Sequence, residues 1–282
     1  MKRRILLVLT VCLAFCLLTG GIPTKRFGMG RPFNMAPFGM VDECDANFNP
    51  TKISGLVLDL DARYGITTSL TSAVLCSIWA DQSGSGRNVT VGGAGAAAVA
   101  REPVINSSAL NGKPGLVFDG LAGGAGDYLF LDWADAQDIA QPLTIFIICS
   151  DPVKDATATR TLNGAAGTFF PLGSFATSGA YTFNGGGTAQ QGGTIVDGVF
   201  HKIRITYVGS AGNDSLLVDG ISIAKGNAGD SDMKALYIGT DMLPAKFADV
   251  TVCRILIYNK SINKGSDDLT KLNAYFLKLY GL

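Results

Sequence analysis

Residues 197–207 of the chain read Asp-Gly-Val-Phe-His-Lys-Ile-Arg-Ile-Thr-Tyr, and the interpretation of the fold starts from this stretch. From residue 200 onward the side chains point alternately to the two sides of an extended segment. One side carries His201, Ile203, Ile205 and Tyr207. The other carries Lys202, Arg204 and Thr206. Alternation with a period of two predicts a β-strand.

The stretch that follows predicts a hairpin. Two short apolar segments, 216–218 and 221–223, flank the dipeptide Asp219-Gly220. A two-residue turn of type I′ needs positive φ at both central positions, and Asp-Gly is among the dipeptides that provide it. We therefore expect two antiparallel strands joined at this dipeptide.

Similar segments bounded by Gly, Asp or Asn continue along the chain. We expect further strands at residues 56–61, 77–79, 116–118, 128–131, 143–148 and 250–258. The segment 143–148 reads Leu-Thr-Ile-Phe-Ile-Ile and lacks alternation, which predicts a strand covered on both faces.

One helix is expected, at the C-terminal end. Ser266 is suited to cap it, and the two aspartates that follow favour its positive N-terminal end. An apolar stripe at helical spacing comes next, formed by Leu269, Leu272, Phe276 and Leu279. Gly281 is expected to end the helix. The sequence thus predicts an all-β, two-sheet antiparallel sandwich with a short C-terminal helix.

The composition limits the classes of function. Lysine plus arginine and aspartate plus glutamate each number 23, so no basic field is present and nucleic-acid binding is not expected. With 47% hydrophobic residues, the 282-residue chain can bury a large core. Sandwiches of roughly 200–250 residues commonly form one domain, so we interpret residues 51–282 as a single domain.

Residues 1–21 have the layout of a secretory signal peptide, with Lys2-Arg3-Arg4, an apolar run over 5–18 and small residues after it. The alternative is an uncleaved N-terminal anchor, although the run is shorter than the roughly 20 residues of a spanning helix. Both interpretations predict a secreted or cell-surface protein.

Residues 22–50 mix Gly, Pro, Met and Phe without a period, which indicates a flexible arm or linker. The alternative is that the phenylalanines and basic residues of this arm dock onto a partner. In that case the arm would support a homo-oligomer or a virion assembly.

Four cysteines would remain after removal of a signal peptide, namely Cys44, Cys76, Cys149 and Cys253. Four cysteines permit three pairings, and the spacing does not choose among them. We interpret them as small buried hydrophobic residues, with disulfides as the alternative. The single histidine and the lack of a Cys-x-x-Cys pair argue against a zinc site.

Three segments together resemble bacterial and phage members of the concanavalin A-like lectin/glucanase superfamily, and laminin-G-like jelly rolls in particular. Residues 79–88, Trp-Ala-Asp-Gln-Ser-Gly-Ser-Gly-Arg-Asn, are similar to the family's Trp-x-Asp-x-Ser-Gly loop. Residues 197–203 are similar to its Asp-Gly-x-Trp-His-x-Val strand, with Phe200 in place of Trp. The third segment, 236–276, is similar to the closing strands and final helix, with Ala248 where Gly is frequent. The resemblance covers about residues 53–282 and implies a jelly roll, but no particular ligand.

Catalysis is not expected. Glucanases of this superfamily carry paired glutamates in a Glu-x-Asp-x-x-Glu phrase, whereas the only glutamates here, Glu43 and Glu102, lie outside the expected strands. Asp59 and Asp61 would share one face of a strand, and we interpret them as a strand end or structural turn rather than a catalytic pair. His201 is interpreted as a hydrogen-bonded structural residue.

Two kinds of binding residue are candidates. Asp81, Asp119 and Asp127 lie in Gly-rich loops and could bind calcium, with turn capping as the alternative. Tyr128, Trp133 and Tyr181 could stack on sugar rings, with packing in the core or an interface as the alternative.

These inferences predict a non-catalytic recognition module that binds carbohydrate or protein through loops of the sandwich, with no cofactor other than calcium. One alternative is a phage virion decoration or tail protein of the same fold, located in the virion. The other is a polysaccharide-cleaving enzyme.

Overall fold

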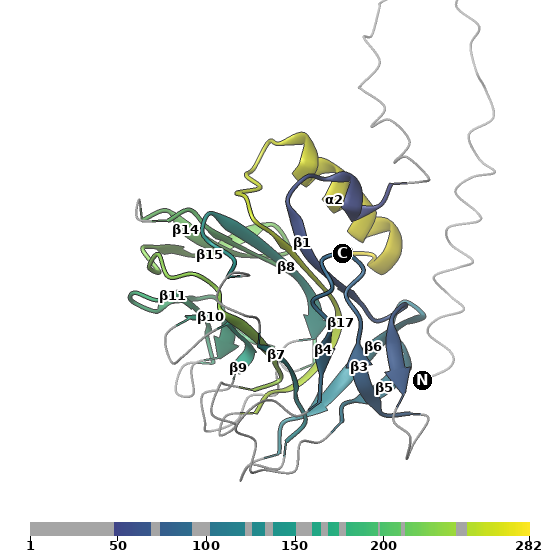
Figure 1. Cartoon of the computed structure of the whole chain (residues 1–282). Coiled ribbons are helices and arrows are strands. Elements are labelled where there is room, and N and C mark those ends of the chain that lie inside the picture. The colour runs from purple at the N-terminus through teal and green to yellow at the C-terminus, as the bar shows by residue number, and fades with distance from the viewer. Residues whose placement is uncertain are drawn as a thin grey trace, which may run out of the picture. The chain divides into compact units, whose positions relative to one another are not determined.

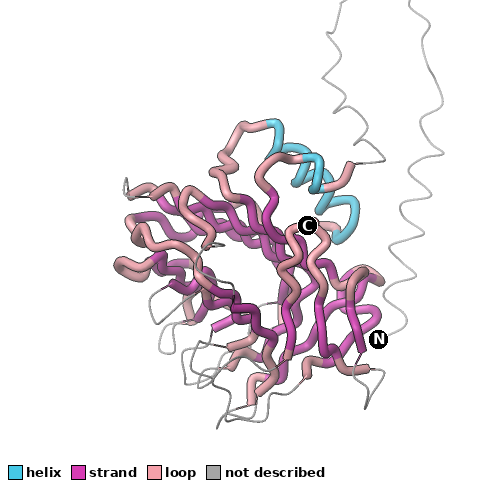
Figure 2. Tube along the Cα trace, in the orientation of Figure 1, coloured by secondary structure: helices cyan, strands magenta, loops and turns pink. Residues whose placement is uncertain are grey.

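The computed structural model describes residues 48–68, 74–91, 102–121, 126–132, 138–150, 160–164, 169–174, 179–196, 198–209, 212–240 and 247–282. These residues form two antiparallel sheets that face each other, and a C-terminal helix lies outside them (Figures 1 and 2). The predicted two-sheet sandwich is therefore confirmed. The expected signal peptide or anchor at 1–21 lies outside the described residues, as does the arm up to residue 47.

The first sheet, sheet A, has eight strands. Seven follow the order β15 (Ile221–Gly226), β14 (Asp214–Val218), β13 (Phe200–Tyr207), β8 (Leu143–Ser150), β17 (Asp249–Tyr258), β6 (Lys113–Asp119) and β5 (Val104–Leu110). The eighth, β1 (Leu56–Asp61), pairs with the second half of β17, whose first half pairs with β6.

The second sheet, sheet B, has nine strands. Their order is β12 (Gln190–Gly192), β11 (Tyr181–Gly185), β10 (Phe169–Ser174), β9 (Arg160–Asn163), β16 (Ala235–Ile238), β7 (Leu129–Asp132), β4 (Val89–Thr90), β3 (Cys76–Trp79) and β2 (Ile66–Thr68).

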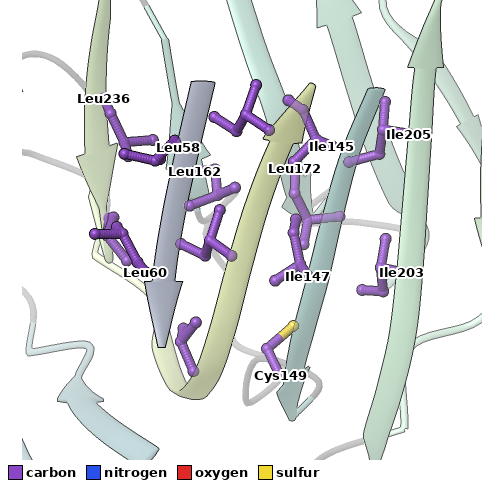
Figure 3. Close-up of a cluster of buried hydrophobic side chains, with 14 of the residues drawn as sticks. Leu58, Leu60, Ile145, Ile147, Cys149, Leu162, Leu172, Ile203, Ile205 and Leu236 are labelled. Carbon is purple, nitrogen blue, oxygen red and sulfur yellow. The ribbon is translucent and has the colours of Figure 1, made fainter. Parts of the chain in front are cut away.

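The main core fills the space between the sheets. Sheet A contributes Ile203, Ile205 and Tyr207 of β13, together with every second residue of β8 and Leu58 and Leu60 of β1. Figure 3 shows part of this layer, in which residues of sheet A such as Leu58, Ile145 and Ile203 lie in one cluster with Leu162, Leu172 and Leu236 of sheet B. Each buried side chain of this size contributes roughly 1.5–3 kcal/mol, so this layer is the main source of stability.

A second hydrophobic cluster covers the outer face of sheet A. Helix α2 (Asp267–Tyr280) lies on this face (Figure 1) and buries Leu272 and Phe276 against Phe146 and Leu256. All eight residues of β8 are therefore buried. The prediction that this strand is covered on both faces is confirmed.

The predicted ends of α2 are confirmed as well. The side chain of Ser266 accepts a hydrogen bond from the main-chain N–H of Leu269, at 3.2 Å. Gly281 adopts a left-handed conformation with φ 76°, and its N–H bonds the carbonyl oxygen of Leu277. The Asp219-Gly220 hairpin also has the expected geometry, with φ of 50° and 83°.

The folded region begins before residue 51. A short 3-10 helix, η1 (Pro50–Lys52), is capped by Asn49, and the ring of Phe48 packs edge-on against Tyr275 with centroids 5.6 Å apart. Residues 48–50, which the sequence placed in the arm, thus belong to the sandwich. No helix in the described part of the chain is long and apolar enough to cross a membrane.

The cysteines that the structure describes are buried, as the sequence suggested, whereas Cys44 lies outside the described residues. Cys76 and Cys253 carry free thiols, and burial raises the pKa of each to about 12. Because the thiolate is the reactive form, we expect both to resist iodoacetamide at pH 8 in the folded protein and to react after unfolding. Peptide mass spectrometry checks this, and rapid labelling of either residue under native conditions would contradict the burial.

Candidate functional site

A polar hollow lies where the loop after β11 approaches the loop after β15. We call it the loop hollow. It is lined by Gly186, Gly187, Thr188, Asn227, Gly229 and Asp230 and has a volume of about 340 Å³. The strands that lead into it belong to different sheets, and both lie on the side of the sandwich away from α2 (Figure 1). Small-molecule sites typically occupy about 300–1,000 Å³, so its size is sufficient for a ligand.

Main-chain hydrogen bonds join the two loops. The N–H groups of Gly185 and Gly187 both donate to the carbonyl oxygen of Ala228, at 2.7 and 2.8 Å. The N–H of Ser231 donates to the carbonyl oxygen of Gly185, at 2.8 Å. The two walls of the loop hollow are thereby held in one arrangement.

Three side chains support these loops. The carboxamide of Asn184 accepts from Gly186 N–H at 2.7 Å and donates to the Gly187 carbonyl at 3.1 Å. Gln141 Nε2 donates to the carbonyls of Gly229 and Ser231. Asp214, fully buried, accepts the N–H of Ala228 at 2.8 Å. A site supported in this way is preformed, which reduces the entropic cost of binding.

Glycine is required where the loops meet. Gly229 has φ 108°, and a Cβ there would come within 2.2 Å of the main-chain nitrogen of Gly187. A larger residue would therefore separate the loops, and the glycines keep the backbone accessible from the hollow.

The lining provides hydrogen-bonding groups and little else. Thr188 offers a hydroxyl group, Asn227 an amide and Asp230 the only carboxylate among the lining residues. Such groups suit the hydroxyls of a sugar or polar groups of a peptide. Hydrolysis by two carboxyl groups, one acting as acid and the other as base or nucleophile, is not supported by this set.

Asp59 and Asp61 lie in a different place, between the edge of sheet A and α2. Arg254 donates to both oxygens of Asp59, at 3.1 and 2.8 Å, and lies 2.9 Å from Asp61. Arg63 binds Asp61 at 2.6 Å, and both arginines also donate to the hydroxyl of Tyr275. We call these residues the buried ion network. Asp59, Asp61 and Arg254 are each at most 3% exposed, so the aspartates act structurally.

The pKa shifts in the network follow from burial and charge. Burial acts to raise the pKa of Asp61, but the hydrogen bond from Arg63 and the charges of Arg254 and Arg63 outweigh it, and the pKa is lowered. For Asp59 burial dominates and raises the pKa, although Arg254 opposes this. Both carboxylates are engaged by arginines, which leaves neither available as a catalytic acid or nucleophile.

The calcium candidates cap loops in the described structure. Asp81 accepts main-chain N–H groups of Asp59 and Ser83, both at 2.9 Å. Asp119 accepts from the N–H of Asp127 at 3.0 Å, and Asp127 accepts from that of Asp119 at 3.3 Å. Within the ranges that the structure describes, no three His, Cys, Asp or Glu side chains are grouped to hold a metal ion.

Two of the three aromatic candidates, Tyr128 and Tyr181, are not available as an exposed platform. Tyr128 is 1% exposed because it packs with Phe130 and Phe247 in a cluster separate from the main core. Tyr181 is 2% exposed within the main core, so neither ring presents a face to a ligand. Trp133 lies outside the described residues. His201 has the structural role that was expected, since its Nδ1 lies 2.6 Å from Oδ2 of Asp219, the first residue of the hairpin turn.

Sequence reasoning did not identify the loop hollow. The run Gly185-Gly186-Gly187 was visible as a glycine-rich loop, but nothing local linked it to residues 227–230. The only other signal in the sequence was the position of two polar residues, Asn184 and Asp214, next to expected turns.

No protein-family model matches the chain, and no sequence among the curated proteins matches it. Solved structures do match. The Trypanosoma rangeli sialidase in complex with the inhibitor DANA has a TM-score of 0.53 at 18% identity, with 80% of this chain and 33% of that chain covered.

Two toxin domains are similar to the same extent. The binding domain of Paraclostridial Mosquitocidal Protein 1 has a TM-score of 0.53 at 12% identity, over 81% of this chain and 53% of that one. The binding domain of Botulinum neurotoxin DC, in complex with rat synaptotagmin II, has 0.52 at 11%, over 80% and 52%. The chain thus spans about a third to a half of these proteins, and the likeness shows a shared β-sandwich fold.

Proposed function

We propose that the chain is a non-catalytic recognition module that binds carbohydrate at the loop hollow. The observation that carries this proposal is the hollow itself, in which hydrogen-bonding groups on two loops are fixed by Asn184, Gln141 and Asp214. Preformed polar groups of this kind favour a ligand rich in hydroxyls.

The fold supports the proposal. Two of the similar sandwiches are binding domains of toxins, and the third belongs to a sialidase solved with the inhibitor DANA and with sialic acid. We further propose, from the resemblance of three sequence segments, that the domain is concanavalin A-like and acts outside the cell or at its surface. A protein ligand at the same loops is the alternative outcome of the test below.

The proposal is tested on a glycan array with the wild-type chain and the variant Asp230→Ala. Asp230 is exposed and lines the loop hollow, so its removal should spare the fold. Losing a charged hydrogen bond costs about 1.5–3 kcal/mol, so we expect binding to the preferred glycan to weaken about tenfold or more.

Asp267→Ala is the matched control, because Asp267 is equally exposed but lies on α2.

Since the oxygens of Asp81 and Asp119 already accept main-chain N–H groups, we expect a calcium chelator to leave glycan binding unchanged. Three results would count against the proposal: no binding to any glycan, equal binding by Asp230→Ala, or release of reducing sugar from the bound glycan.

A further inference from the structure

A second cavity lies outside the sandwich, between sheet A and helix α2. We call it the outer cavity, and its volume is about 160 Å³. Arg204 on β13 pairs directly with Phe146 on β8 and Leu217 on β14, so these three side chains form one row on the outer face of the sheet. The lining of the outer cavity includes Phe146, Lys202, Arg204, Leu217, Lys264 and Leu269.

Arg204 is buried there, and none of the described residues forms an ion pair with it. It is 8% exposed, its Nη1 donates to the main-chain oxygen of Ile262 at 3.2 Å, and its Nε has no hydrogen-bond partner. Burial lowers its pKa. Arg254, buried on the same sheet, has two aspartate partners, whereas Arg204 has no acidic partner in the part of the chain that the structure describes.

Two lysines add positive charge to the same space. Lys202 is two residues before Arg204 on β13, and Lys264 lies in the loop before α2. The Nζ of Lys202 donates to the main-chain oxygen of Leu282 at 3.5 Å. Burial lowers the pKa of Lys202; the carboxylate of Asp219 opposes this, and the charge of Arg204 adds to it. None of the described residues that line the outer cavity has an acidic side chain.

A buried cation that lacks a partner lowers the stability of the folded protein, because its desolvation is not compensated. An anion bound in the outer cavity would compensate this desolvation. The planar guanidinium of arginine matches a carboxylate with two parallel hydrogen bonds. Phe146, Leu217 and Leu269 contribute apolar surface, and Gly220 and the amide residue Asn273 complete the lining. These surfaces favour a ligand with a carbon body over a small, fully hydrated ion.

We propose that the outer cavity binds a small organic carboxylate, with its charge at Arg204, Lys202 and Lys264 and its carbon body on the apolar row. The volume suits a single compact unit, below the roughly 300 Å³ at which typical ligand pockets begin. Such a carboxylate occurs as a free acid or as the acidic terminal residue of a glycan. This site is independent of the loop hollow. It adds to the proposed function a second binding function that is selective for negatively charged ligands.

Calorimetry with the full chain tests the proposal with four probes: glucuronate, glucose, inorganic phosphate and the methyl glycoside of glucuronate. We expect glucuronate to bind, with an affinity that falls as salt is added, and glucose not to bind. If the glycoside binds as well as the free acid, the site accepts the end of a glycan. If the glycoside fails, the site takes the free acid.

Variants locate the site. Lys264→Glu changes an exposed side chain of the lining and should weaken glucuronate binding about tenfold or more, whereas Lys271→Glu, exposed on α2 away from the lining, should not. Arg204→Met tests the guanidinium itself, and its thermal unfolding is measured first. If that variant unfolds, Lys264→Glu alone decides.

Three results would overturn the proposal. The first is that glucose or phosphate binds as tightly as glucuronate. The second is that glucuronate does not bind at millimolar concentration. The third is that the Lys264→Glu variant binds glucuronate as tightly as the wild-type chain. Asp230→Ala should leave glucuronate binding intact, so a failure of the loop hollow as a glycan site is distinguishable from a failure of the outer cavity.

Discussion

Replacing Arg254 with methionine is expected to lower the free energy of unfolding by about 3–5 kcal/mol, because the change leaves a buried carboxylate without its partner. Arg254 is 3% exposed and binds both Asp59 and Asp61. Asp61 would keep Arg63, but Asp59 would have no cation within the buried ion network. Urea unfolding followed by intrinsic fluorescence measures the effect.

The pH dependence of this loss of stability distinguishes the effect of an unpaired buried charge from the effect of lost packing. Burial already raises the pKa of Asp59, and without Arg254 the opposing charge is removed. A folded-state pKa that is raised favours the folded protein as pH falls, so the deficit of the variant relative to wild type should be smaller at pH 5 than at pH 8. Adding Asp59→Asn should recover part of the loss. Equal deficits at both pH values would contradict this explanation.

Replacing Phe276 with alanine is expected to cost about 3–5 kcal/mol, the usual range for removing a buried aromatic ring. Phe276 is fully buried in the cluster that joins α2 to sheet A, and its ring centroid lies 5.8 Å from that of Phe146. The same urea titration measures the change.

The neighbouring residue provides the control. Leu277 is 63% exposed on the same helix, so Leu277→Ala should change the stability by no more than about 0.5 kcal/mol. If both variants lost less than about 1 kcal/mol, the second cluster would not hold the helix on the sheet.

Strong local patterns in the sequence were sufficient to predict much of the fold. The alternation in β13, the unbroken apolar run in β8, the Asp219-Gly220 turn and both ends of α2 each have a local cause, and each was predicted from it. Strands without such a pattern were missed. In β11, Thr182 and Asn184 are buried, which sequence hydrophobicity does not indicate, and β12 contains two glutamines.

The two proposed sites, the loop hollow and the outer cavity, were not predictable from the sequence for the same reason. The loop hollow depends on the approach of loops from different sheets, which is a consequence of the closed sandwich. Arg204 was assigned correctly to the polar face of its strand, but its burial results from α2 covering that face. A pattern within one strand does not indicate which distant element covers it. The prediction of stacking at Tyr128 and Tyr181 failed for the related reason that composition does not reveal burial.

The central claim, that the loops of the sandwich bind a glycan without cleaving it, is tested most directly by NMR. The folded chain is titrated with the glycan that it prefers on the array, and the spectra of the protein and of the glycan are followed together. We expect amide shifts to concentrate at residues 186–188 and 227–230 and the glycan signals to stay those of the intact sugar. Shifts confined to other regions, or the appearance of cleavage products, would contradict the account.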